Sequence, residues 1–596
     1  MKHMLLSLLL LSVSMVGYAQ DIESFFKNEQ GLLREKLYLH TDKPYYSAGD
    51  TIWFRGTLVN AETLSYNIQT NFIYVELLSA TDSLVCRKKV KREGVCFHHS
   101  IPLEITLNEG YYYLRGYSEW MLNFGDTFVF EKKISICNNL KKTSSSFPLK
   151  ERDYHVDFLP EGGHLLAGTK QVVAFKALRN DGYSEDVRGF ICNEKGDTLS
   201  HFSTLHAGMG TVMIDVPTSG RLIAHTIASD NHAKEVALPD IQQSGFALSV
   251  GRSNDSLKVR INACNEADSL HGKFRLIVHS EGFLQEHCEV HGNEHVFSTK
   301  EWLDGVNQIL LCDTTGKVVS RRLVFINNLI NKEEWSMSVE GATSDKRQRV
   351  RLDFELHDEK GEPLLGDFSI SVTDAKVIEP DTLANDIVSH LLLTNTLNGR
   401  IENPAWYFHQ GTDRMRELDL VMLTHGWCGF KTDNLARNNE YDLPYCIENM
   451  QYISGRIEGG LPNSRKVFVS THNTYENRLI LDRVNSDGTF CLKGLEFVDS
   501  TYFNVRIVAR GSANKRIYFD KIQYPKSAYK YHNFRLKGVD YEPIRKYFPS
   551  FMGYMTYVLP ELEVKESRRS KFAGMRHSWY ASAWNENELM KLISVS

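Results

Sequence analysis

The stretch EKLYLHTDKPYYSAGDTIWFRGTLVN, residues 35–60, decides the fold. On both sides of a central turn its apolar residues alternate with polar ones, and a period of two residues is typical of a half-buried β-strand. Pro44 fixes φ and lacks an N–H donor, so the chain must bend between the two strands. We therefore assign to the core of a β-sandwich the apolar residues Leu37, Leu39, Ile52, Phe54 and Leu58.

The same stretch carries three residues that could act as acids or bases, namely His40, Asp42 and Asp50. All three flank the bend, where polar side chains commonly hydrogen-bond the backbone. We interpret them as turn and edge residues of a β-module and not as an active site.

The composition favours an all-β chain of several domains. A chain of 596 residues is too long for one hydrophobic core, and a usual size of about 100 to 200 residues predicts about four to six domains. Aromatic residues make up 11% of the chain, which favours strands over helices. The formal net charge of -5 gives no electrostatic reason to bind nucleic acid or anionic lipid.

A strand, an acidic turn that contains glycine and a second strand recur along the chain. The clearest strand is VRLDFEL, residues 350–356, in which apolar and charged residues alternate. The turns of this kind are residues 193–197, 313–317, 358–361 and 485–488. Their wide spacing is typical of separate sandwiches and not of a solenoid. The predicted fold class is all-β, with tandem immunoglobulin-like sandwiches.

Two segments break the strand pattern and predict a small helical insertion at about residues 376–440. Residues 381–399 begin with an acidic side chain, carry apolar residues at helical spacing and end in Gly399, so they predict a capped helix. Residues 413–425 have Leu418 and Val421 on one face and predict a second helix.

The N-terminus predicts export. Lys2 precedes an apolar run, residues 4–16, and small residues lead to Ala19, so we expect a signal peptide at residues 1–19. No later segment reaches 18 consecutive apolar residues, and we expect no transmembrane segment. The remaining boundaries are sandwiches at 34–140, 150–240, 245–330, 335–445 and 448–535, and a tail at 540–596.

The ten cysteines form no CxxC pair and no zinc pattern. Cys86 and Cys96 could close a hairpin through a disulfide, which an exported chain allows. A chain of this size folds without such bonds, so single buried thiols are the favoured interpretation.

The search for chemistry finds no nucleophile elbow, phosphate-binding loop, HExxH or dinucleotide fingerprint. In the run 287–291, His287, Glu289 and His291 share one face of a strand and could ligate zinc. The favoured alternative is that Cys288 and Val290 form the buried face and the other three are its wet side. We assign no catalytic residue, no cofactor-binding residue, no metal ligand and no cofactor.

Two aromatic clusters, residues 111–113 and 117–120, could stack on sugars. Alternate residues of a strand point to opposite faces, so part of each cluster must enter the core. Core and edge packing is therefore favoured over a carbohydrate site.

The opening stretch also resembles a known family, the alpha-2-macroglobulin superfamily, in the form found in exported Bacteroidetes proteins. It is similar to the second macroglobulin-type domain (MG2) at residues 41–45, at Gly49 and Asp50, and at residues 52–54. Further similar segments follow in order at residues 156–168, 173–182, 202–210, 321–327, 368–376, 391–408 and 418–430. The resemblance covers about residues 34–565 and implies macroglobulin-type β-sandwiches.

Two later segments carry resemblances of their own. Residues 450–508 resemble a carboxypeptidase regulatory-like domain, which implies a transthyretin-like C-terminal sandwich. Residues 556–569 resemble the lead into a TonB-dependent receptor plug. Because the sequence stops at Ser596, we expect neither plug nor barrel.

Well-known members of the superfamily trap proteases through an accessible bait region and a thioester. The thioester needs a Cys-Gly-Glu-Gln-like run, and residues 428–430, Cys-Gly-Phe, do not supply it. The insertion at about 376–440 is the only large bait candidate and is expected to be packed.

Three functions remain open at this stage. The first is a non-enzymatic, exported binding or scaffold protein of the cell envelope, periplasmic or outer-membrane associated, with a protein partner beside a TonB-dependent uptake system. The second is a macroglobulin-like endopeptidase inhibitor without a thioester. The third is a carbohydrate-binding module.

Overall fold

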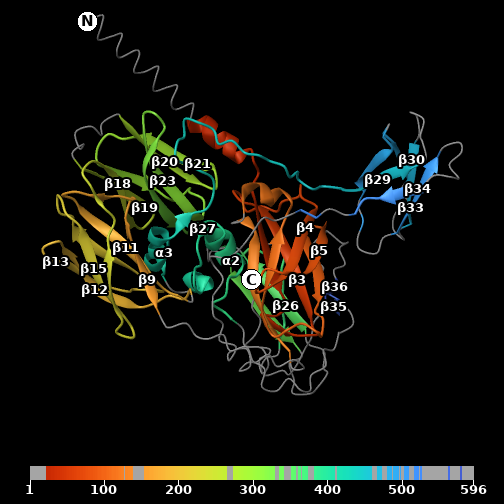
Figure 1. Cartoon of the computed structure of the whole chain (residues 1–596), viewed down its shortest axis with the longest axis horizontal. Coiled ribbons are helices and arrows are strands. Elements are labelled where there is room, and N and C mark those ends of the chain that lie inside the picture. The colour runs from red at the N-terminus through yellow and green to blue at the C-terminus, as the bar shows by residue number, and fades with distance from the viewer. Residues whose placement is uncertain are drawn as a thin grey trace, which may run out of the picture.

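The structure is a computed structural model, and Figure 1 shows β-sheets gathered into separate sandwiches around a few short helices. It describes residues 22–125, 128–138, 153–180, 182–264, 273–328, 334–340, 351–357, 360–363, 366–373, 381–409, 413–458, 466–472, 479–485, 487–495, 497, 502–508, 516–521, 524, 525, 562, 563, 578 and 579. The predicted all-β sandwich fold is confirmed. The predicted signal peptide lies outside the described residues, as do part of the turn at 358–361 and most of the predicted tail.

Sandwich one is an eight-stranded sheet of order β1-β3-β6-β5-β4-β7-β8-β2. Its elements are β1 (Glu35–Thr41), β2 (Tyr45–Ser47), β3 (Thr51–Asn60), β4 (Phe72–Ser79), β5 (Leu84–Glu93), β6 (Cys96–Pro102), β7 (Gly110–Tyr117), the short helix η1 (Trp120–Phe124) and β8 (Phe130–Cys137). Strand β5 pairs with β4 along most of its length but with β6 only at Arg92 and Glu93. The sheet therefore folds over at β5, and its two halves enclose one core.

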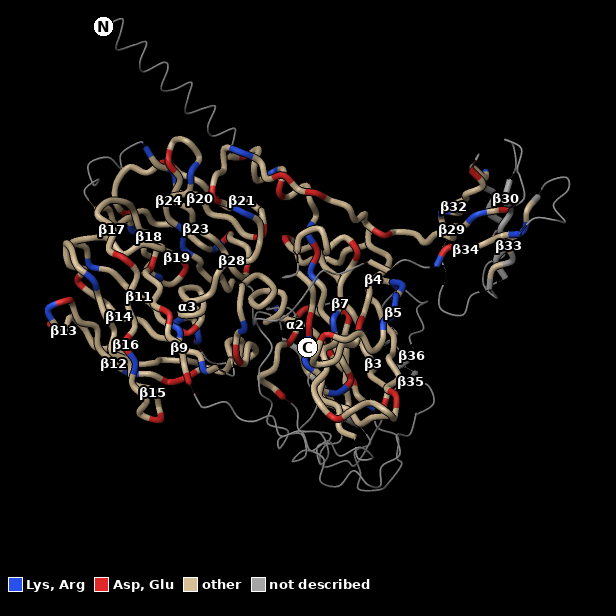
Figure 2. The backbone as a smooth tube through the Cα atoms, viewed as in Figure 1, with Lys and Arg blue, Asp and Glu red and all other residues tan. Residues whose placement is uncertain are grey.

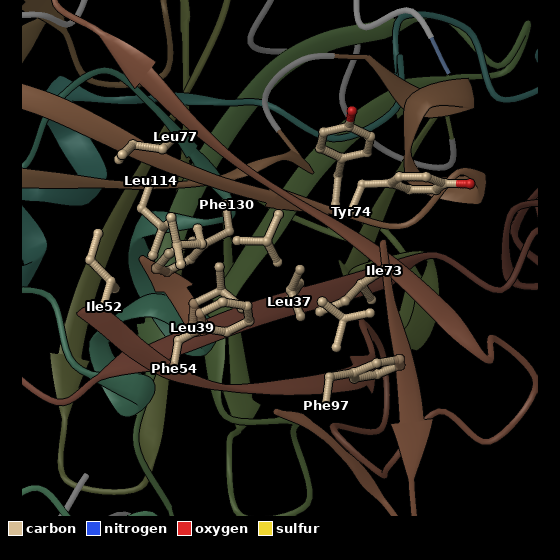
Figure 3. Packing of buried hydrophobic residues seen from close by; sticks show 14 of the residues in the cluster. Leu37, Leu39, Ile52, Phe54, Ile73, Tyr74, Leu77, Phe97, Leu114 and Phe130 are labelled. Carbon is tan, nitrogen blue, oxygen red and sulfur yellow. The ribbon is translucent and has the colours of Figure 1, made fainter. Parts of the chain in front are cut away.

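The opening stretch supplies the centre of that core. Strands β1 and β3 pair antiparallel, with Leu37 opposite Leu58 and Thr41 opposite Phe54. Figure 3 shows side chains of both strands packed against those of β4, β6, β7 and β8. All five predicted core residues are buried, namely Leu37, Leu39, Ile52, Phe54 and Leu58. The prediction of these core positions is confirmed.

The turn between β1 and β3 is held by its two aspartates. Asp42 Oδ1 accepts hydrogen bonds from the Trp53 amide at 3.0 Å and the Tyr46 hydroxyl at 2.6 Å. Asp50 Oδ2 lies 3.1 Å from Lys43 Nζ and accepts the Ser47 amide at 3.1 Å. Burial raises the pKa of Asp42. Both aspartates are turn residues, as predicted.

Sandwich two faces the three-stranded sheet β14-β11-β9 against the four-stranded sheet β13-β12-β15-β16. Its strands are β9 (Tyr154–Pro160), β10 (Leu165–Leu166), β11 (Lys170–Arg179), β12 (Val187–Asn193), β13 (Thr198–Ser203), β14 (Met209–Asp215), β15 (Leu222–Ala228), β16 (Ala233–Ala237) and β17 (Ile241–Gln242). Phe158, Phe175 and Phe202 meet in its core with ring centroids 5.0 to 5.9 Å apart.

Sandwich three pairs the sheet β18-β19-β22 with the sheet β21-β20-β23-β24. Its strands are β18 (Gly245–Ser253), β19 (Ser256–Cys264), β20 (Phe274–Ser280), β21 (Phe283–Glu289), β22 (Glu294–Ser298), β23 (Gly305–Asp313) and β24 (Val318–Ile326). Strands β20 and β23 are buried on both faces, because alternate residues of each enter two different apolar clusters. Another part of the chain must therefore cover the outer face of this sheet.

The chain then forms a two-stranded sheet and an irregular, mostly helical segment. The elements are β25 (Glu334–Glu340), β26 (Arg351–His357), α2 (Ile387–Ser389), the π-helical turn η4 (His390–Thr394), β27 (Leu397–Asn398), the 3-10 helix η5 (Pro404–Phe408), α3 (Met415–Thr424) and β28 (Gly426–Trp427). The predicted second helix is confirmed as α3, with Leu418 and Val421 buried.

The predicted helix at 381–399 is wrong in extent. Asp386, and not Asp381, caps the start, since its carboxylate accepts the Ser389 amide at 2.8 Å. The far end leaves the helix because Leu397 pairs with Trp427 across β27 and β28. Residues at both ends of the predicted helix instead form a turn and a short strand. Tertiary contacts determine these structures, so the local helical pattern did not reveal them.

The C-terminal sandwich consists of the sheets β32-β29-β34 and β31-β30-β33. Its strands are β29 (Gln451–Glu458), β30 (Lys466–His472), β31 (Leu479–Arg483), β32 (Thr489–Leu495), β33 (Tyr502–Val508) and β34 (Arg516–Phe519), and two short strands, β35 (Leu562–Glu563) and β36 (Ser578–Trp579), pair after it. Ile457, Phe490 and Leu492 form its buried centre. In Figure 1 it stands apart from the other sandwiches.

Candidate functional site

The helical insertion is the hub of the molecule. We use "hub" for residues 381–409 and 413–435. Its buried apolar side chains share one cluster with Met209 of sandwich two and with Leu323 and Phe325 of sandwich three. The hub members of this cluster are Leu393, Leu397, Ile401, Tyr407, Leu418, Leu420, Val421 and Met422. The insertion is thus packed between sandwiches, as expected.

A buried arginine ties sandwiches two and three to the hub. Arg322 of β24 donates from Nε to Glu161 Oε1 at 2.9 Å, and Glu161 follows β9 in sandwich two. The same guanidinium donates from Nη2 to both carboxylate oxygens of Asp419 in α3, at 2.8 and 2.9 Å. Arg322 is 4% exposed, so the two carboxylates compensate a positive charge that water does not solvate.

A buried lysine joins sandwich one to sandwich three and the hub. Lys36 Nζ of β1 lies 2.7 Å from Glu281 Oε1, in the turn between β20 and β21. It also donates to the Leu391 carbonyl at 2.8 Å and to Thr396 Oγ1 at 3.1 Å, both in the hub. One side chain therefore holds three parts of the fold together.

The helix at residues 22–30 covers the outer face of sandwich three. Phe25 and Phe26 are each 1% exposed and share an apolar cluster with Ile277, Leu310 and the hub residue Phe430. This helix precedes sandwich one in the sequence but packs on sandwich three. It thereby adds a second link between these sandwiches.

An extended segment, residues 436–449, leads from the hub to the C-terminal sandwich, and we call it the strap. The Asn123 side chain of η1 exchanges two hydrogen bonds with the Tyr445 backbone, at 2.9 and 3.0 Å. Glu448 accepts from the Tyr74 hydroxyl at 2.9 Å and forms an ion pair with Lys89. Figure 2 shows the strap running along sandwich one towards β29.

Two histidines where the hub meets sandwiches one and three, His390 and His279, are buried and uncharged at neutral pH. His390 Nε2 donates to the Leu37 carbonyl at 2.9 Å, and burial lowers the pKa of His390 to about 3. His279 Nε2 donates to Gln308 Oε1 at 2.9 Å, and burial lowers the pKa of His279 to about 4. These imidazoles hold domains in place rather than facing solvent.

His40 lies in β1, the strand at one end of the sheet order, so it is an edge residue as the sequence suggested. Its Nδ1 atom lies 2.5 Å from Ser369 Oγ, and burial lowers the pKa of His40 to about 4. A serine beside a neutral histidine is the first part of a nucleophilic dyad, but Ser369 is itself buried. The contact joins β1 to a segment 329 residues later, and nothing in the local sequence could have predicted it.

Two of the residues considered as zinc ligands contact other side chains. His287 Nε2 lies 3.8 Å from a Glu23 carboxylate oxygen, and Glu289 pairs with Arg275 at 3.1 Å. Val290 is buried and Cys288 packs on the core of sandwich three, which is the favoured alternative. Among the described residues, no group of three or more His, Cys, Asp and Glu is arranged to hold a metal ion.

The aromatic clusters mostly serve the core. Tyr112, Tyr113 and Tyr117 are buried in sandwich one, and Lys133 Nζ lies 4.1 Å from the centre of the Tyr111 ring. The core interpretation is confirmed. All ten cysteines lie within the described residues, and none forms a disulfide. Cys86 and Cys96 are therefore both free thiols; of the ten cysteines five are buried, four are partly buried and Cys446 is exposed.

Charges of both signs are interspersed over the sandwiches (Figure 2). In the described part of the chain, no helix is long and apolar enough to cross a membrane.

No protein-family model matches the chain, and no curated protein sequence matches it. Among solved structures, Escherichia coli alpha-2-macroglobulin activated by porcine elastase matches with 10% identity over 55% of this chain and 34% of that one, at a TM-score of 0.19. Salmonella alpha-2-macroglobulin reacted with methylamine matches with 9% identity over 81% of this chain and 37% of that one, at a TM-score of 0.16.

A third match is a tetra-tandem repeat in the extending region of a large adhesion protein, with 10% identity over 82% of this chain and 97% of that one, at a TM-score of 0.15. The chain spans about a third of the length of the macroglobulins named above. Bacterial macroglobulins are thus among its structural matches. The Bacteroidetes, carboxypeptidase regulatory-like and TonB-related resemblances stay predictions.

Proposed function

We propose that the chain is a non-enzymatic, exported binding or scaffold protein of the cell envelope. The observation that carries this proposal is the hub, whose apolar and charged side chains are used to fix three sandwiches against one another. The groups most capable of chemistry, such as His390, Arg322 and Lys36, are buried in these joints. Such an arrangement supports a rigid frame that presents its sheet edges, loops and C-terminal sandwich to a protein partner.

The finer part of the proposal is the setting. An outer-membrane partner beside a TonB-dependent uptake system is supported by the tail at 556–569, which resembles the lead into a receptor plug. Crosslinking in intact cells, followed by purification of the chain, tests this setting. Enrichment of one outer-membrane protein over a matched exported control supports it, and recovery of the chain alone contradicts it.

The second candidate is a macroglobulin-like inhibitor without a thioester. It needs an accessible segment that proteases cut, and the tight packing of the hub counts against the insertion in that role. Native gels of the chain mixed with an active protease decide between the two. A protease that stays bound and active on small substrates after cleaving the chain supports the inhibitor.

Carbohydrate binding is the third candidate and has the least support, because the tyrosines that suggested it are mostly buried. A glycan array with the full chain tests it directly. Specific binding that Tyr111→Ala removes would restore this candidate.

A further inference from the structure

The joint between sandwich one and the hub contains a histidine whose two ring nitrogens both have roles. His390 Nε2 lies 2.9 Å from the Leu37 carbonyl oxygen, which can only accept, so Nε2 carries the proton. Nδ1 is then an acceptor, with Asn385 Nδ2 at 3.3 Å and Thr394 Oγ1 at 3.4 Å. The neutral imidazole is therefore the form that fits this site.

A proton on Nδ1 would disrupt that arrangement. The added N–H would face the amide group of Asn385, which is itself a donor in this geometry, and the Thr394 hydroxyl oxygen would accept it only at a long 3.4 Å. The rings of Tyr38 and Phe130 close the site, with centroids 5.8 and 5.1 Å from that of His390. The charged group that faces His390 is Lys36 of β1, whose ammonium is paired with Glu281. A second positive charge there has no anion of its own.

The joint between the N-terminal helix and sandwich three has a similar design. His279 Nε2 donates to Gln308 Oε1, and the buried Nδ1 atom has no hydrogen-bond partner. Its ring lies among Phe26 of the helix and Trp427 and Phe430 of the hub, with centroids 5.1 to 5.5 Å away.

Two charged groups face His279. Glu281 follows on the turn after β20 and would attract a charged imidazole, but it is already paired with Lys36. Arg34 would repel it, and its guanidinium is paired with Glu29 of the N-terminal helix at 2.5 Å. Water is needed to solvate a proton on Nδ1, and the apolar rings exclude it.

We propose that acid opens these two joints: protonation of His390 releases sandwich one from the hub, and protonation of His279 releases the N-terminal helix from sandwich three, while each sandwich stays folded. The inference does not depend on the proposed function, because it concerns only how the parts of the chain are held together.

The direction of the effect follows from burial. An imidazole released to water has the ordinary pKa of 6.5, whereas burial lowers the pKa of His390 to about 3 and that of His279 to about 4. Below pH 6.5 the two histidines bind protons in the open form but not in the closed form, so the closed form loses stability as the pH falls. At pH 4.5, His390 alone shifts the equilibrium towards the open form by about 100-fold.

The test is small-angle X-ray scattering of the full chain from pH 7.5 to 4, with near-UV circular dichroism on the same samples. We expect the radius of gyration to rise reversibly below about pH 5 while the near-UV signal is retained. His390→Gln keeps a donor for Leu37 but cannot titrate, and it should stay compact to a lower pH. His155→Gln, at an exposed pair with Asp157, is the control and should behave as the natural chain.

Opening of His390→Gln at the same pH as the natural chain, or loss of the near-UV signal together with opening, would overturn the proposal. If that variant does not fold, proton NMR of the natural chain gives the answer. A histidine C2 resonance, assigned to His390 through its contacts with Phe130, should remain in the neutral form to below pH 5. Titration of that resonance near pH 6.5 in the compact chain would contradict the proposal.

Discussion

Lys36 Nζ lies 2.7 Å from Glu281 Oε1, although 245 residues separate them in the sequence. Their side chains are 3% and 9% exposed, so water does not weaken the attraction as it does at a surface. This ion pair and the two hub acceptors of Lys36 fix the position of sandwich one relative to sandwich three.

Lys36→Met should therefore weaken this joint strongly. Removing one partner of a buried ion pair leaves the other charge uncompensated and costs about 3–5 kcal/mol. Lys258→Met is the matched control, because its pair with Glu294 is exposed to solvent and should contribute little to stability. Urea unfolding followed by tryptophan fluorescence measures both, and equal losses would show that the Lys36 joint is unimportant.

Phe26→Ala should detach the N-terminal helix from sandwich three. Replacing a buried phenylalanine with alanine costs about 3–5 kcal/mol of stability. A nine-residue helix is not stable in water by itself, so it depends on this packing. Hydrogen exchange at residues 22–30 should rise to the rate of an unfolded peptide. Lys27→Ala, on the exposed side of the same helix, should leave the exchange slow. Slow exchange in Phe26→Ala would mean that the helix is held by other contacts.

Glu448→Ala should free the C-terminal end of the strap. The change removes the acceptor of the Tyr74 hydroxyl and the partner of Lys89. Fluorescence energy transfer between dyes on sandwich one and the C-terminal sandwich should show a broader distance distribution. Glu458→Ala, in an exposed pair with Arg456, is the control. An unchanged distribution would indicate that other contacts hold the C-terminal sandwich, namely those of Asn71 with the backbone of Glu448 and Asn449 or those of Tyr524 with Tyr74 and Arg87.

Thiol labelling should show one fast site. Cys446 is exposed, whereas the other nine cysteines are buried or partly buried. Burial also raises the pKa of Cys86, and of Cys288 to about 11, which reduces their reactive thiolate at neutral pH. A thiol reagent should modify one site rapidly in the folded chain and ten after denaturation. Persistence of the fast site in Cys446→Ser would contradict the placement of the strap.

The sequence was sufficient for features that local patterns control. Period-two alternation placed Leu37 and Phe54 in the core, and the polar residues around Pro44 identified a turn. The helical pattern located α3 correctly. It failed for 381–399, where pairing of Leu397 with Trp427 competes with the helix.

Contacts between residues far apart in the sequence could not be predicted from the sequence alone. The pairs Lys36–Glu281, His40–Ser369 and Arg322–Asp419 join positions far apart, and no local motif marks one partner for the other. The hub was recognised as an insertion but not as the element that connects three sandwiches. Its role follows only from the shared apolar cluster and the buried charges.

Mass-mapped limited proteolysis of the folded chain at neutral pH tests the central claim that the hub is a packed connector. The structure predicts that early cuts fall outside residues 381–409 and 413–435 and leave sandwiches one, two and three associated in size-exclusion chromatography. Early cleavage within the hub, followed by compaction of the chain around the protease, would contradict this account and favour an inhibitor.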